Sequence, residues 1–343
     1  MKIDKLFLGV LLLIVLIFIG VFISLYPKEE KKVVVYVSHD QDYSEPILKE
    51  FEELSGIRVE ALYDTETTKT VGLVNRLLME KNNPRADVYW NNEVIRSILL
   101  KKEGVLQPYC SPNAADIPDI YKDKDCYWTG FAARARVILY NIEKIGEDEV
   151  PTSINDFINS KWKGKACIAK PLLGTTSTHA AALFTLLGED GAKDLFLKMK
   201  ENEVQIVESN SMVRDQVVAG ECWFGLTDTD DAYDAIREGK LVKMVFPDQG
   251  EAQIGNLIIP NSVMMIKNAP HPEEAKKLID FLLSSKVEEE LSKTALQIPL
   301  KKSSIAPENV PHANEIKSFN VTYEEIYKKL EVANEFVKEL FLT

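Results

Sequence analysis

The stretch that decides the fold is WTGFAARARVILYN, residues 128–141. It is long and mostly apolar, and it carries Arg134 and Arg136 in its interior. We predict an extended strand here that crosses between two lobes. A second long and mostly apolar segment, residues 255–266, is interrupted by Pro260. The chain is therefore expected to leave its first lobe near residue 131 and to return near residue 255.

Strands and helices alternate on both sides of these two segments. The β-branched run of residues 33–37 predicts a buried strand. A helix is expected after it, with Ser44 as N-cap and Gly56 at its end. This alternation continues to a final amphipathic helix at residues 323–340 and predicts an α/β fold with a largely parallel sheet. We expect lobe 1 to comprise residues 33–130 and 256–343, and lobe 2 to comprise residues 131–255.

The N-terminus carries an apolar run that predicts a membrane segment. Residues 6–26 contain no charged side chain, and as a helix they would span roughly 31 Å, enough for a bilayer core. No Ala-x-Ala cleavage site and no nearby cysteine for a lipid anchor follow the run. Residues 1–32 are therefore interpreted as an uncleaved signal-anchor helix and a tether, with a cleaved signal peptide as the alternative. The remaining chain is expected on the extracytoplasmic face of the cell membrane.

Charge and cysteine content restrict the partners and the compartment. The 343 residues include 53 acidic and 41 basic side chains, for a net charge of −12, which argues against a nucleic-acid partner. Four cysteines allow three connectivities, and the sequence does not choose among them. Cys110 and Cys126 flank a Pro/Asp/Asn-rich loop, and together with the expected export this suggests a disulfide between them. Cys167 and Cys222 lie in apolar runs and are expected to be small buried residues.

Polar segments follow several of the expected strands. In α/β folds of this kind, ligands bind at the carboxyl ends of strands, in the cleft between lobes. The segments in that position are residues 38–42, 91–93, 174–179, 209–211 and 227–231. His39 and His179, in two of these segments, are expected to be solvated.

Two of these segments suggest opposite ligand charges. Residues 174–179 place glycine and hydroxyl side chains before a helix expected from Thr178, an arrangement that binds anions or simply caps the helix. Residues 227–231 hold three carboxylates, Asp228, Asp230 and Asp231. Packed carboxylates repel one another unless a cation or hydrogen-bond donors neutralise them. The alternative is an ordinary helix N-terminus, which favours acidic residues.

The order and spacing of several short segments resemble a known family. These segments are residues 35–51, 86–90 (ADVYW), 128–137 (WTGFAARARV), 162–165 (WKGK), 209–211 (SNS), 224–226 (FGL), 259–261 (IPN) and 271–275 (HPEEA). Together they resemble the type II periplasmic or extracellular solute-binding proteins of ABC transporters, in the ferric-ion-binding branch. The resemblance covers about residues 33–300 and implies the two-lobe periplasmic-binding-protein-like II fold.

The resemblance also implies a ligand set. In ferric-binding relatives an adjacent tyrosine pair follows the Phe-Gly-Leu strand, and this sequence has Asp230 and Asp231 there. The tyrosinate site is thus absent, while the anion pocket matches better. The expected ligand- or metal-binding residues are Asp40, Gln41, Asn92, Glu93, Asp228, Asp230 and Asp231. The expected anion-binding residues are Arg134, Gly174, Thr175, Thr176, Ser177 and Asn210.

The function implied by the resemblance is that of a membrane-tethered solute-binding protein that delivers its ligand to an ABC transporter permease. No cofactor is implied, but Fe³⁺ or another hard cation would be the ligand, together with a synergistic anion. The alternatives are an organic or phosphorylated anion bound by the same fold, and a sensor module. No Ser/His/Asp or Cys/His arrangement has a spacing that supports an enzyme.

Overall fold

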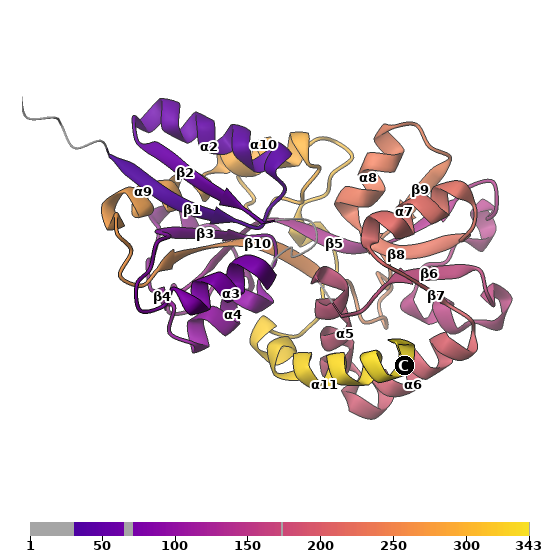
Figure 1. Cartoon of the computed structure of the whole chain (residues 1–343). Helices are drawn as coiled ribbons and strands as arrows, with labels where there is room; N and C mark the ends of the chain where they lie inside the picture. Colours follow the sequence, from indigo (N-terminus) through magenta and orange to yellow (C-terminus); the bar gives the residue numbers. More distant parts are fainter. Residues whose placement is uncertain (1–30, 65–70, 173, 343) are drawn as a thin grey trace, which may run out of the picture.

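The computed structural model describes residues 31–64, 71–172 and 174–342, which form a mixed sheet flanked by helices (Figure 1). The strands run in the order β2-β1-β3-β10-β5-β8-β6-β7, and β4 and β9 add to β10 and β5. Their bounds are Lys32–Val37 (β1), Arg58–Tyr63 (β2), Val88–Asn91 (β3), Leu106–Gln107 (β4), Thr129–Asn141 (β5), Ala166–Ala169 (β6), Gln205–Val207 (β7), Phe224–Asp228 (β8), Val242–Val245 (β9) and Ile258–Ile266 (β10).

The crossing strand predicted at residues 128–141 is confirmed as β5. Its first part pairs antiparallel with β10, from Thr129 to Ala135, and its last part pairs with β8 and β9, from Arg136 onwards. We call β1–β4 and β10 the first half of the sheet and β6–β9 the second half. The predicted two-lobe α/β architecture is present, but the sheet is mixed rather than largely parallel, because β5 and β10 both run against their neighbours.

The junction between the halves is irregular in both of its strands. Ala132 in β5 has a φ of 38°, and the register of β10 shifts between Pro260 and Asn261. The side chain of the buried Glu288 accepts hydrogen bonds from the backbone N–H groups of Ala132 (2.9 Å) and Leu300 (3.1 Å). A protein carboxylate therefore satisfies the backbone where the regular strand pairing is interrupted.

The predicted helices are present, and two of them start earlier than expected. The described helices are Gln41–Ser55 (α2), Val71–Met79 (α3), Ile95–Lys102 (α4), Gly174–Leu186 (α5), Gly188–Glu201 (α6), Asn210–Ala219 (α7), Thr229–Arg237 (α8), Pro272–Leu282 (α9), Ser285–Thr294 (α10) and Tyr323–Leu342 (α11). Ser44 is not an N-cap, because α2 starts earlier and the Ser44 hydroxyl donates to the carbonyl of Asp40. Helix α5 starts at Gly174, not at Thr178.

Helix α11 connects the layers of the two lobes. It lies along α5 and α6 in Figure 1, and its first turns also contact α4. The ammonium group of Lys102, the last residue of α4, stacks over the ring of Tyr327 at 4.0 Å. The ammonium group of Lys329 pairs with Glu189 of α6 at 2.9 Å. The C-terminal helix is therefore fixed to elements on both sides of β5.

The cysteine predictions are confirmed. Cys110 and Cys126 form a disulfide with a Cα–Cα distance of 5.1 Å, and Cys167 and Cys222 are buried. Within the described ranges, none of the helices has the length and apolar character that a bilayer crossing requires. The membrane segment predicted at residues 6–26 lies outside the described residues.

Candidate functional site

The centre of the site is a buried arginine–aspartate pair beside the junction of the two halves. Arg134 and Arg136 are two residues apart in β5, so they project from the same face of the strand. Arg136 is 1% exposed and donates through Nη1 to Oδ1 of Asp228 at 2.6 Å. The same nitrogen lies 3.2 Å from the Thr175 hydroxyl and 3.1 Å from Oδ1 of Asn210. Four elements, β5, β8, α5 and α7, therefore meet at one guanidinium.

Asp228 is satisfied by the same neighbours. Its Oδ2 accepts a 2.6 Å hydrogen bond from the Thr175 hydroxyl and a 2.9 Å bond from the side-chain amide of Asn210. Charge neutralisation by Arg136 and two neutral donors is what allows a carboxylate to stay buried. The chemistry available to a ligand must therefore come chiefly from the groups around this pair.

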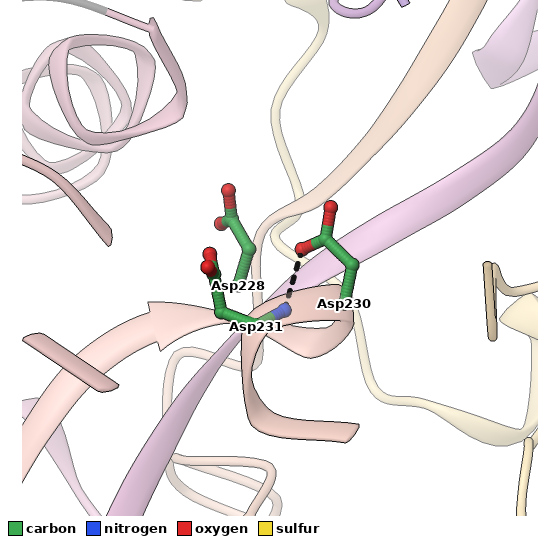
Figure 2. A group of neighbouring side chains, drawn as sticks. All are labelled: Asp228, Asp230 and Asp231. Atoms are coloured by element: carbon green, nitrogen blue, oxygen red, sulfur yellow. Dashed lines mark hydrogen bonds between the residues drawn. The ribbon is translucent and has the colours of Figure 1, made fainter. Parts of the chain in front are cut away.

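Asp230 and Asp231 extend the acidic group toward solvent. The three aspartates come from the end of β8 and the first turn of α8, as Figure 2 shows, and one carboxylate oxygen of each lies within 4.8 Å of the others. The backbone N–H of Asp231 donates to the Asp230 carboxylate at 3.1 Å. The Asp230 and Asp231 side chains are 25% and 18% exposed, against 3% for Asp228. Two carboxylates are thus accessible above a third that is already neutralised.

Burial and mutual repulsion shift the acidity of this pair. Burial raises the pKa of Asp231 well above its ordinary value, and the negative charges of Asp230 and Asp228 raise it further. Burial also raises the pKa of Asp230; Arg134 opposes this effect, while Asp228 and Asp40 add to it. Arg214 of α7 offers only a long contact to Asp231, at 3.9 Å. The pair therefore carries more negative charge than its protein partners neutralise.

Arg134 reaches from β5 to both halves of the molecule. Its Nη1 lies 3.4 Å from Oδ2 of Asp230, and its Nη2 donates to the backbone carbonyl of Asn92, in the turn between β3 and α4. Burial acts to lower the pKa of Arg134, but nearby carboxylates, Asp230 foremost, outweigh it and raise the pKa. Its Nε is buried and has no hydrogen-bond partner among the described residues. This arginine retains donor capacity next to the acidic pair.

The remaining predicted cation ligands lie in the first half of the molecule. Both oxygens of Glu93 accept backbone N–H groups at the start of α4, from Ile95 (2.5 Å) and Arg96 (2.9 Å). Gln41 is exposed and donates to Glu45, one turn along α2, at 2.7 Å. Asp40 is the N-terminal flanking residue of α2, and its charge acts on Arg134 and Asp230. Asp40 is thus the acid of the first half that electrostatics link to the aspartate pair.

The predicted anion segment is the first turn of α5, and its hydroxyls point to different partners. Gly174 begins the helix with a φ of 55°. Beyond the Thr175 contact described above, the Thr176 hydroxyl donates to Oδ1 of Asn210 at 3.2 Å. The Ser177 hydroxyl donates instead to Asn334 of α11 at 2.8 Å. Thr175, Thr176 and Asn210 therefore lie together at the site, while Ser177 fastens α5 to α11.

Both loop histidines are buried, so the expectation that they are solvated is wrong. His179 is 5% exposed in α5 and stacks on Phe319, with ring centroids 5.9 Å apart. Burial, assisted by the charge of Arg136, lowers the pKa of His179 to about 3. His39 is also 5% exposed, and its Nε2 lies 2.8 Å from the side-chain amide nitrogen of Gln297. His179 lies in a helix that starts earlier than predicted, and His39 packs against the ring of Trp90 at the end of β3.

Two arginines at the site were not among the predicted site residues. Arg136 occupies its centre, and the alternation of side chains in a strand that already placed Arg134 was the signal for it. Arg214 lies four residues after Asn210 in α7, the spacing of one helical turn. A helix predicted to start near Asn210 would place Arg214 on the same face as Asn210.

A two-lobe α/β fold whose polar groups meet beside the crossing strand defines the class of solute-binding proteins. The family model for bacterial extracellular solute-binding proteins matches residues 98–329, and the chain belongs to this family. The iron uptake protein A1 of Synechocystis sp. is 26% identical over 91% of this chain and 88% of its own length.

Solved structures agree with the fold. Iron-bound HitA of Pseudomonas aeruginosa superposes with a TM-score of 0.81 at 21% identity, over 91% of this chain and 99% of the other. AfuA of Actinobacillus pleuropneumoniae, solved with exogenous fructose-6-phosphate bound, gives a TM-score of 0.75 at 23% identity, over 91% and 98%. One fold thus carries a metal ion in one of these proteins and a sugar phosphate in another.

Proposed function

We propose that this protein is the extracytoplasmic binding component of an ABC importer and that it captures a hard metal cation, ferric iron first, between its two lobes. Asp230 and Asp231 would supply the carboxylate ligands, and Arg134 with Thr176 would hold a synergistic anion such as carbonate or citrate. The closed, loaded form would then dock on a membrane permease. The name of the Synechocystis relative supports iron as the first candidate.

The observation that carries this proposal is the crowding of the acidic group. Three carboxylate oxygens lie within 4.8 Å, and Asp228 has an arginine at 2.6 Å, whereas the arginines nearest to Asp230 and Asp231 stand at 3.4 Å and 3.9 Å. Crowded, partly buried carboxylates with raised pKa values are stabilised by a multivalent cation, which replaces the missing positive charge. Oxygen donors of this kind suit hard cations.

The test removes the negative charge from the pair. Asp230→Asn with Asp231→Asn should weaken binding of ferric citrate at least about tenfold, or about 1.4 kcal/mol, in a titration followed by calorimetry or tryptophan fluorescence. Asp194→Asn is the control, because Asp194 is an exposed aspartate that pairs with Lys198 within α6. Unchanged affinity in the double variant would rule out the aspartate pair as the cation site.

A second candidate is a phosphorylated organic anion. The unpartnered Nε of Arg134 and the hydroxyl of Thr176 are donors that a phosphate would use, and the AfuA structure shows that the fold accepts fructose-6-phosphate. In this case Thr176→Val should weaken binding of fructose-6-phosphate or inorganic phosphate, while Ser177→Ala, which faces α11, should not. Loss of affinity in Thr176→Val with full affinity in the aspartate double variant would favour the anion over the cation.

We also propose that residues 6–26 tether the protein to the membrane from outside. The support is the length of the uncharged run and the absence from its end of an Ala-x-Ala sequence. N-terminal sequencing of protein from its own host should find the initial segment retained, and the protein should require detergent for extraction. A mature N-terminus near Pro27 or Lys31 would show instead that the segment is a cleaved signal.

A further inference from the structure

Two buried cysteines face the same apolar core in the second half of the sheet. Cys167 lies in β6, opposite Gly225 of β8, and Cys222 lies two residues before β8 begins. Both are 0% exposed and belong to one cluster of buried side chains that includes Val213 and Val217 of α7. Residues far apart in the sequence thus bring two thiols to one side of the sheet.

The two free thiols lie in this one cluster, and Cys222 is the neighbour with the largest effect on the pKa of the Cys167 thiol. The Cys167 thiol donates to the carbonyl of Phe224 at 3.9 Å, and the Cys222 thiol donates to Oε1 of Gln216 at 3.3 Å. The absence of a side chain at Gly225 keeps this space open, because a Cβ there would lie 3.0 Å from the Cys167 sulfur and 2.4 Å from Val213. A side chain at position 225 would therefore collide with the space that the Cys167 sulfur occupies.

We propose that Cys167 and Cys222 form a second disulfide when the protein matures outside the cytoplasm. The Cys110–Cys126 disulfide already indicates a compartment in which such bonds persist, and the family is extracellular. The oxidant is a thiol–disulfide oxidoreductase in its disulfide form. Two S–H bonds of the chain break, an S–S bond forms, and the two electrons and two protons convert the oxidoreductase disulfide into two thiols.

The bond forms before the second half of the sheet is fully packed. Attack requires a thiolate, and the Cys222 contact together with burial raises the pKa of the Cys167 thiol above its ordinary value. Both side chains are also inaccessible to a protein oxidant once α7 covers β6 and β8. Oxidation therefore belongs to the folding chain or to a transient opening of this region.

The test counts thiols in the full chain. Protein refolded with glutathione, its disulfide and a thiol–disulfide oxidoreductase is denatured, and its thiols are titrated under non-reducing conditions. We expect no titratable thiol and a peptide map that joins the Cys167 and Cys222 peptides. Two thiols mapped to these residues beside an intact Cys110–Cys126 bond would overturn the proposal, and so would a bond from either residue to Cys110 or Cys126.

Cysteine variants distinguish a Cys167–Cys222 disulfide from two thiols that are only buried. Cys222→Ala should leave one titratable thiol, at Cys167, and Cys110→Ala with Cys126→Ala should retain the Cys167–Cys222 bond. The oxidised wild-type chain should unfold at a higher urea concentration than a chain in which only Cys167 and Cys222 are reduced. In the Cys222→Ala variant, the same redox treatment should leave the midpoint unchanged. Equal midpoints for the two wild-type forms would contradict the proposed cross-link.

Discussion

At the scale of single residues, the site depends on how Arg136 and Asp228 hold each other in a buried position. The two charged atoms are 2.6 Å apart, and the side chains are 1% and 3% exposed. Thr175 and Asn210 donate hydrogen bonds to the other oxygen of Asp228, so protein groups rather than water stabilise both charges. Removal of one partner from such a pair leaves an uncompensated buried charge, which costs much more than loss of a surface pair.

Arg136→Met should therefore destabilise the protein by about 3–5 kcal/mol, as measured by urea unfolding. Lys243→Met is the control, because Lys243 pairs with Glu147 at 3.0 Å between side chains that are 55% and 86% exposed. Exposed pairs of that kind contribute about 0–1 kcal/mol. Similar losses in the two variants would show that the Arg136–Asp228 pair is not a buried charge centre.

His179 should make stability depend on pH. Its pKa is lowered from 6.5 to about 3 in the folded protein, so the unfolded chain binds the additional proton between these values. The stabilisation is complete above pH 6.5 and is lost as the pH falls toward 3, by about 1.4 kcal/mol per pH unit. His179→Phe keeps an aromatic ring beside Phe319 and should lack this component in urea unfolding at a series of pH values. His312→Gln, which removes a half-exposed imidazole, should retain the wild-type slope.

At the scale of elements, the long apolar run of β5 and the alternation around it could be predicted, while several helix starts could not. Gly174 to Ser177 have the composition of a loop, yet they form the first turns of α5. Their hydroxyls find partners on β8, α7 and α11, which a local pattern does not contain. These hydroxyls therefore form hydrogen bonds with distant elements and do not cap a helix that starts at Thr178.

Neighbouring elements approach the crossing strand β5 closely at Gly130. A Cβ at this position would lie 2.6 Å from the backbone oxygen of Tyr121 and 3.0 Å from Cβ of Pro260. Gly130→Ala should therefore cost about 1–3 kcal/mol of stability. Gly146→Ala is the matched control, because nothing lies within 4 Å of a Cβ there and its φ of −72° suits alanine. An equal midpoint of urea unfolding for both variants would contradict the close approach.

At the scale of the whole molecule, the sequence indicated which segments meet but not which atoms remain available. The ends of β3, β8 and α5 do come together around Arg134 and Arg136. Both oxygens of Glu93 already accept backbone N–H groups of their own segment, and the side chain of Gln41 donates to Glu45 on the surface of α2. Such competition between local and long-range partners depends on distances that a linear pattern does not give.

Contacts of α8 with residues that follow β10 should influence closure of the lobes. The Tyr233 hydroxyl donates to the carbonyl of Asn309 at 2.5 Å, and Arg237 donates to the carbonyl of Thr294 at 3.2 Å. Tyr233→Phe with Arg237→Met removes both bonds, at about 1 kcal/mol each, and should weaken solute binding by roughly tenfold or more. Small-angle scattering of the ligand-free variant should give a larger radius of gyration than the wild type. Asp194→Asn, which alters an exposed pair within α6, should change neither quantity.

The position of β10 affects the order in which the protein can fold during synthesis. This strand lies between β3 and β5 in the sheet, although it follows the entire second half in the chain. The edge of β3 that later pairs with β10 has no partner strand until Ile266 has left the ribosome. During this time it remains open to pairing with other chains. The first half of the sheet can therefore close only when the polypeptide is nearly complete. This delay suits a chain that crosses a membrane before it folds, and it makes the unfinished chain dependent on protection from aggregation.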